Sequence, residues 1–365
     1  MTLRAVQDGP APGRRRRRWS IGLAIVALLG LAVSVFLPCP YVVESPGPVF
    51  DALGRVAQSG GRSADVVQVR GAATYPTSGR LDVLTVSVLG TPDQQPSWGD
   101  VVAGWFRPHS AVTPMEAFYA PGTTTKQTNA ATQQQMTQSQ QDAVAAALRQ
   151  LGYTVPATAH VAGFGSGASA AGVLRKGDVI VAVDGQPAAS TTQLRAAAKA
   201  HGTAGTPLSL LIERDGQQST VQVKPTRVDG IWAVGVLLSW SYDFPVRVSI
   251  HLADVGGPSA GLTFALATVD RLSPESLTGG QHIAGTGTMS PTGEVGAIGG
   301  IRQKMVGARS AGARWFLAPT ANCDEVVGHV PAGLHVVAVS TLDQAVTDLQ
   351  TIAASKSAAG LRTCR

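Results

Sequence analysis

Charged residues and cysteines are scarce in this sequence of 365 residues. Only 14% of the residues are charged, and the three cysteines do not have the spacing of a metal-binding motif. The Gly-x4-Gly-Lys-[Ser/Thr] pattern of a phosphate-binding loop is also missing, so we expect no ATP-driven step. These absences predict a protein that needs no cofactor and no metal.

Net positive charge is nearly absent outside the first residues of the chain. The formal net charge is +6, but residues 1–18 hold six arginines against the single acid Asp8, which accounts for five of these charges. The rest of the chain is therefore close to neutral, and we expect no nucleic-acid partner. Lysine is rarer still, with six residues among the 29 lysines and arginines.

A long apolar run follows the arginines at 14–18. It extends from Ile21 to Leu37 and is interrupted only by small residues, which is the lower limit of length for a membrane-spanning helix. Arginines on its N-terminal side favour a cytoplasmic N-terminus. We therefore predict a single-pass protein of the cell membrane with its catalytic domain outside the cytoplasm. A signal peptide that is cleaved near residues 32–34 is the alternative.

The region between residues 41 and 130 shows no recognisable chemistry. Residues 81–89 alternate apolar and polar side chains, as a strand does. Residues 123–141 are rich in Thr, Gln, Asn and Ser, which favours a solvated loop that leads into a helix at 142–151.

A candidate nucleophile stands in the sequence Gly257-Pro258-Ser259-Ala260-Gly261. Apolar residues with helical spacing follow it, so Ser259 is expected at the N-terminus of a buried helix. Unpaired backbone N–H groups at that end can stabilise an oxyanion.

A candidate base lies 45 positions later, in Gly299-Gly300-Ile301-Arg302-Gln303-Lys304. Helical spacing from Ile301 and a capping glycine at Gly312 place Lys304 near the start of a second helix. A desolvated lysine can lose its proton and act as a general base, whereas an arginine cannot. A mechanism based on His251 or His282 is disfavoured, because neither lies in a triad pattern.

These motifs resemble the proteolytic domain of Lon-type serine peptidases over roughly residues 245–350. The resemblance also includes Thr286-Gly287-Thr288-Met289. It implies that Ser259 is the nucleophile and Lys304 its base, that Thr286 helps to hold the lysine, and that Gly257, Pro258 and Ala260 support the site. Gly256 departs from the family, since many Lon proteins carry an acidic residue three before the serine. Lon-type domains often assemble as rings, which makes a homo-oligomer one possible assembly.

A second resemblance covers Lys176-Gly177-Asp178-Val179-Ile180 and Val183-Asp184-Gly185. With the glycine-rich stretch from Gly163, they are similar to a PDZ domain of the bacterial protease-associated kind. The resemblance implies an extended peptide bound beside a helix, with residues 151–153 as a weak candidate for the loop that binds the peptide carboxylate. A spacer or gate is the alternative role.

As a whole, the chain resembles the membrane-anchored PDZ–Lon peptidases of Gram-positive bacteria. We expect a multidomain protein with one N-terminal transmembrane helix, a mainly β PDZ-like domain and an α/β Lon-type domain. The implied function is an ATP-independent serine endopeptidase for exported or membrane-proximal proteins, and the alternative is an inert scaffold that binds peptide tails. Cys323 and Cys364 could form a disulfide. The expected segments are a cytoplasmic basic tail (1–18), an anchor (19–38), an extracytoplasmic region (39–150), the PDZ-like domain (151–229), the proteolytic domain (230–352) and a tail (353–365).

Overall fold

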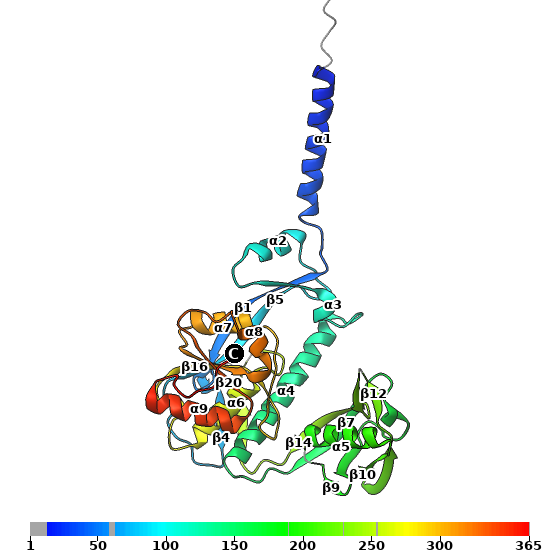
Figure 1. Cartoon of the computed structure of the whole chain (residues 1–365), viewed down its shortest axis with the longest axis vertical. Helices are drawn as coiled ribbons and strands as arrows, with labels where there is room; N and C mark the ends of the chain where they lie inside the picture. The colour runs from blue at the N-terminus through cyan, green and yellow to red at the C-terminus, as the bar shows by residue number, and fades with distance from the viewer. Residues whose placement is uncertain (1–12, 58–62, 189, 229, 253–254, 365) are drawn as a thin grey trace, which may run out of the picture. The chain divides into compact units, whose positions relative to one another are not determined.

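The computed structural model describes residues 13–57, 63–188, 190–228, 230–252 and 255–364 (Figure 1). Its chain forms two compact units. The first is made from residues 1–45 and 87–128, and the second from residues 46–86 and 129–365. Asp254, which the sequence places just before the candidate nucleophile, lies outside the described residues.

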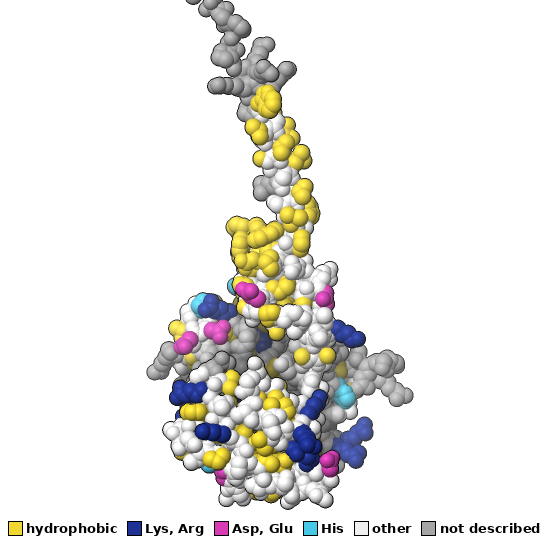
Figure 2. Space-filling view, turned by 90° about the vertical axis from the view of Figure 1, so that its right-hand side faces the viewer, with side chains coloured by type: hydrophobic (Ala, Val, Ile, Leu, Met, Phe, Trp, Pro, Cys, Tyr) yellow, Lys and Arg dark blue, Asp and Glu magenta, His cyan; other side chains and the backbone are white. Residues whose placement is uncertain are grey.

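The predicted transmembrane anchor at 19–38 is wrong. A helix, α1 (Gly13–Ser34), covers this region, and apolar side chains are exposed along its described part (Figure 2). Nevertheless, the described residues include no helix that is long and apolar enough to cross a membrane. Because α1 ends at Ser34, the part after its arginines is shorter than the roughly 20 apolar residues that a span needs. The single-pass location that rested on this anchor is therefore not supported either.

The rest of the first unit contains short elements around a small core. They are the first part of β1 (Tyr41–Asp51), α2 (Trp98–Phe106), β6 (Ala111–Pro114) and α3 (Met115–Phe118). β6 pairs antiparallel with β1, and α2 starts at a capping box formed by Ser97 and Asp100. Cys39 is a free, fully buried cysteine that packs beside Val43 and Val101.

The main sheet has the strand order β20-β19-β16-β5-β1-β6. Its parallel strands are β5 (Arg80–Leu89), β16 (His282–Gly285), β19 (Trp315–Pro319) and β20 (His335–Val339). β5 confirms the strand predicted at 81–89. Helices α6 (Gly261–Leu272), α7 (Ile301–Ser310), α8 (Cys323–Val326) and α9 (Leu342–Ser355) pack with this sheet in one α/β body.

The apolar residues on the two faces of the main sheet show how the helices are layered against it. Successive strand residues pack on opposite faces of the sheet: Ile283 and Leu317 lie in one apolar cluster with α6 and α9, while Ala284 and Phe316 lie in another cluster with α7. Parallel strands that are buried on both faces need such continuous apolar sequences. The sheet therefore holds α6 and α7, the two helices of the candidate site, on its opposite faces.

The loop predicted at 123–141 is wrong, because a single helix, α4, spans Thr125–Gln150. Its buried residues Met136, Ala143 and Ala147 belong to the same apolar cluster as α6. Packing against this core has overridden the polar composition. The helix predicted at 142–151 is confirmed as the last part of α4.

The PDZ-like module has its own sheet, in the order β11-β10-β8-β7-β14, and its own apolar core. The elements of the module are β7 (Ala157–Phe164), η1 (Ser169–Gly172), β8 (Val179–Val183), β9 (Gln186–Pro187), α5 (Thr191–Ala204), β10 (Leu208–Arg214), β11 (Gln217–Val223), β12 (Thr226–Val228), β13 (Ile231–Ala233) and β14 (Val236–Tyr242). The chain enters and leaves it side by side, since the Asp243 N–H donates to the Pro156 carbonyl over 3.1 Å.

This module is inserted into the α/β body. After β14 the chain continues into β15 (Arg247–Ile250), which pairs with β4 (Val67–Arg70) from far earlier in the sequence. The remaining short elements are β2 (Arg55–Ala57), β3 (Ser63–Asp65), β17 (Thr288–Met289), β18 (Val295–Gly296) and η2 (Thr320–Asn322). A Cys323–Cys364 disulfide ties the C-terminal tail to α8.

Candidate active site

Ser259 lies in the turn that leads into α6. The helix begins at Gly261 with Ala260 as its N-cap, and its apolar residues are buried, as the helical spacing predicted. Gly257 has a φ of 82°, a conformation that favours glycine, and Pro258 stiffens the next position. Ser259, the candidate nucleophile, therefore lies on a tight turn whose geometry the local sequence specifies.

Lys304 lies on the first turn of α7, and its Nζ is 2.7 Å from the Oγ of Ser259. The helix starts after Gly300, which has a φ of 68°, and ends just before Gly312. Only 3% of Lys304 is exposed, and this burial lowers the pKa of its amine to about 8. The structure thus brings together two residues that lie 45 positions apart in the sequence.

Thr286 connects the lysine to the nucleophile turn. It follows β16, is fully buried, and its Oγ1 lies 3.2 Å from Lys304 Nζ. The same hydroxyl donates its single proton to the Ser259 carbonyl over 3.0 Å, so it can only accept from the lysine. The Gly287 N–H donates to that carbonyl as well, over 2.9 Å. These bonds hold both the Lys304 amine and the backbone carbonyl of Ser259 in place.

Backbone N–H groups are available beside the nucleophile. Among the described residues, the N–H groups of Ser259 and Ala260 have no acceptor, while the Gly261 N–H donates to the Pro258 carbonyl over 3.3 Å. Free N–H donors at a helix start are the groups that can stabilise an oxyanion.

Two residues of α4 also contact the turn, and the sequence reasoning missed both. The Thr132 carbonyl accepts the N–H of Gly257 over 3.0 Å, and the Ser139 hydroxyl donates to the Pro258 carbonyl over 3.0 Å. Thr132, Met136 and Ser139 have the spacing of one helix face, which was the available signal. A Cβ on Gly256 would lie 3.1 Å from the Thr132 side chain, so α4 stands where the acidic side chain of many Lon proteins would begin.

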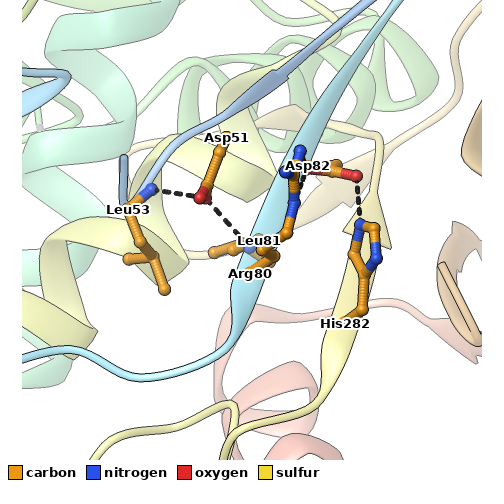
Figure 3. Close-up of polar contacts among 6 residues, drawn as sticks. All are labelled: Asp51, Leu53, Arg80, Leu81, Asp82 and His282. Carbon is orange, nitrogen blue, oxygen red and sulfur yellow. Dashed lines mark hydrogen bonds and ion pairs between the residues drawn. The ribbon is translucent and has the colours of Figure 1, made fainter. Parts of the chain in front are cut away.

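His282 takes part in a different cluster (Figure 3). Its Nε2 lies 2.5 Å from the Oδ2 of the fully buried Asp82, whose Oδ1 pairs with Arg80. His282 begins β16, whereas Thr286 follows the end of that strand, and four residues of strand span about 13 Å. This cluster therefore joins β5 to β16 and does not contact Ser259. His251 donates its backbone N–H to Val66, at the edge of β4.

No metal site is formed in the described part of the chain, where no group of three His, Cys, Asp or Glu residues comes together.

A groove of about 610 Å³ lies between α5 and β14 of the PDZ-like module. Leu194 and Ala198 line it from the helix, Val236 and Leu238 from the strand, and Ile231 from β13. β14 is the last strand of its sheet, and Gly235, with a φ of 73°, directly precedes it. Residues 151–153, the weak candidate for the carboxylate loop, form the turn that follows α4 and do not line this groove. The loop before β14 is the one at the groove.

Comparisons with known proteins match two parts of the chain. Residues 245–351 match the family model for the Lon protease (S16) C-terminal proteolytic domain, and residues 159–224 match the model for the PDZ domain. A Lon protease of Campylobacter concisus is 34% identical over 106 residues, which are 28% of this chain and 13% of that protein. A Lon protease of Citrifermentans bemidjiense is 47% identical over 66 residues, or 18% of this chain and 8% of that protein.

These relatives are much longer than the shared region, since the chain spans 13% or less of their length. A crystal structure of the PDZ domain of an SdrC-like protein from Listeria innocua is 22% identical and has a TM-score of 0.20. It covers 22% of this chain and 90% of that domain. The two family matches show that this chain carries a Lon-type (S16) serine peptidase domain and a PDZ domain.

Proposed function

We propose that this chain is a serine endopeptidase in which Ser259 attacks a peptide carbonyl and neutral Lys304 accepts the hydroxyl proton. The single observation that carries this proposal is the 2.7 Å contact between a serine hydroxyl and an almost completely buried amine. Burial favours the neutral form of the amine, which has the lone pair that a general base requires.

The proposed reaction follows from the contacts of the site. Ser259 Oγ bonds to the carbonyl carbon while its proton moves to Lys304 Nζ, and the resulting ammonium then protonates the departing amine. A water molecule then hydrolyses the acyl-serine in the same way: Lys304 Nζ accepts its proton and returns it to the departing Ser259 Oγ. Thr286 keeps the lysine directed at Ser259, because it accepts from Nζ and donates to the Ser259 carbonyl. The free N–H groups of Ser259 and Ala260 would receive the oxyanion.

The proposed substrates are extended segments of unfolded polypeptides. The 365 residues contain no phosphate-binding loop, so we expect cleavage to proceed without ATP. The groove beside β14 supports a peptide-binding role for the PDZ domain, since an edge strand next to an apolar helix is the arrangement that captures an extended peptide.

The test is cleavage of an unfolded, fluorescently labelled polypeptide by the full chain. Ser259→Ala and Lys304→Arg should each lower kcat by at least about 10³-fold, because arginine keeps the positive charge but cannot accept a proton. Lys356→Arg, at an exposed lysine of the same α/β body, is the matched control and should leave kcat unchanged. Full activity of Lys304→Arg would refute the mechanism.

A serine-directed acylating probe separates the peptidase from an inert scaffold. The wild-type chain should be labelled at Ser259, and Ser259→Ala should not. An unlabelled wild-type chain that still binds peptides would favour the scaffold.

A further inference from the structure

We propose that Ser139 on α4 is a positioning residue, whose hydroxyl fixes the peptide unit between Pro258 and Ser259 and so aims the Ser259 N–H at the oxyanion. This inference rests on the proposed peptidase function and adds to it a residue outside the matched proteolytic region, residues 245–351.

The first step of the argument is the contact itself. Ser139 is 4% exposed, and its Oγ donates to the Pro258 carbonyl over 3.0 Å. A serine inside a helix commonly donates to the carbonyl four residues earlier in the same helix. Here the hydroxyl instead reaches a carbonyl 119 positions away in the sequence, directly before the candidate nucleophile.

The second step is the geometry of the peptide unit. No cis peptide bond occurs in the described part of the chain, and in a trans unit the C=O and N–H point in opposite directions. The Pro258 carbonyl is held by Ser139 and by the Gly261 N–H, so the Ser259 N–H of the same unit must point away from α4. Rotation of this unit would turn that donor away from the substrate.

The third step is the close fit of the turn on α4. A Cβ on Gly261 would lie 3.0 Å from the Ser139 hydroxyl, and a Cβ on Gly256 would lie 3.1 Å from the Thr132 side chain. The Gly257 N–H is bound to the Thr132 carbonyl two helical turns before Ser139. One face of α4 therefore supports the turn, and Ser139 is the side chain of this face that holds the peptide unit with the Ser259 N–H.

The test compares Ser139→Ala with Thr137→Ala, which removes an exposed hydroxyl from the same helix that bonds only to Gln133. Ser139→Ala should lower kcat about 10- to 100-fold, because an oxyanion donor is displaced and not deleted, and should change KM less than about twofold. Its affinity for a peptide boronic acid, which mimics the tetrahedral intermediate, should fall by a similar factor. Thr137→Ala should change none of these values.

A second variant separates positioning from packing. Ser139→Thr keeps the hydroxyl but adds a methyl group in a tightly packed place, so a purely structural role predicts a larger loss of activity for threonine than for alanine. The positioning role predicts the reverse order. A kcat of Ser139→Ala within twofold of an active wild type would overturn the inference, while an inactive wild type would instead refute the proposed peptidase function.

Discussion

Lys304 is the residue on which the proposed chemistry of this site depends. Its type, its place on a helix and its distance in sequence from Ser259 could be read from the sequence, because helix starts are encoded locally by Gly300 and by the spacing of Ile301. Its burial could not be predicted from the sequence, since the residues that remove water from it come from separate segments. That burial lowers the pKa of the amine to about 8.

The pH dependence of cleavage follows from this pKa. Below about pH 8 the amine is mostly protonated and cannot accept a proton, so kcat/KM should rise with pH and level off above an apparent pKa near 8. The measurement is kcat/KM from about pH 6 to about pH 10, with thermal unfolding recorded at each pH as the control. A profile that is flat, or that falls across this range, would contradict a lysine base.

The burial of Lys304 also makes the stability of the fold depend on pH. Stability, like kcat/KM, should rise with pH. Between the lowered pKa in the folded chain and the ordinary value of 10.5, the unfolded chain binds more protons. The contribution of Lys304 to stability therefore improves as pH rises through this window.

At the scale of elements, α4 is the helix whose first half was not predicted from the sequence. Its first half reads as a polar loop, and only contacts with the core and with the turn before α6 explain why it is helical. A helix that is stabilised by tertiary packing on a narrow face is difficult to identify from composition. By contrast, α6, α7 and the strand β5 carry clear apolar patterns and were predicted.

The half-buried contact between α4 and β14 offers a test of this packing. The Tyr242 hydroxyl donates to Asp142 over 2.5 Å, and this bond opposes the burial that raises the pKa of Asp142. Tyr242→Phe should raise that pKa further and lower the free energy of unfolding by about 1–3 kcal/mol at neutral pH. Tyr153→Phe, at an exposed tyrosine, is the control.

The pH dependence of that loss distinguishes the carboxylate from simple packing. A carboxyl group whose pKa is raised by folding stabilises the fold most when it is protonated, and this contribution is lost as pH rises through the raised pKa. The loss in Tyr242→Phe should therefore be largest at neutral pH and small in acid. Urea unfolding at both pH values measures it, and an equal loss at both would indicate a packing effect alone.

At the scale of the whole molecule, the order of the elements along the sequence does not reveal how the α/β body is assembled. The sequence suggests domains in succession, but β5 pairs with β16 about 200 residues later, and the PDZ module interrupts the body between α4 and β15. Pairing between such distant strands leaves no local pattern, so this arrangement could not be derived from the sequence. The two family matches agree with the domain types and do not reveal the interruption.

The PDZ groove can be tested with a matched pair of variants. Ile231 lines the groove and is 69% exposed, so polar substitutions there should cost little stability. Ile231→Asp should weaken the binding of a peptide with a free C-terminus more than Ile231→Asn, because only aspartate repels the carboxylate. Fluorescence anisotropy of labelled peptides measures the difference, which should disappear for a C-terminally amidated peptide. Equal affinities of the two variants for the free acid would argue against a bound carboxylate at this position.

The hydrogen bond between Pro156 and Asp243 has a practical consequence for modular exchange. Because the two chain crossings lie side by side, a short linker could close the gap left by excision, and an unrelated module with neighbouring termini could be inserted in its place. We therefore expect that the PDZ-like module can be replaced without a change in the connectivity of the α/β body.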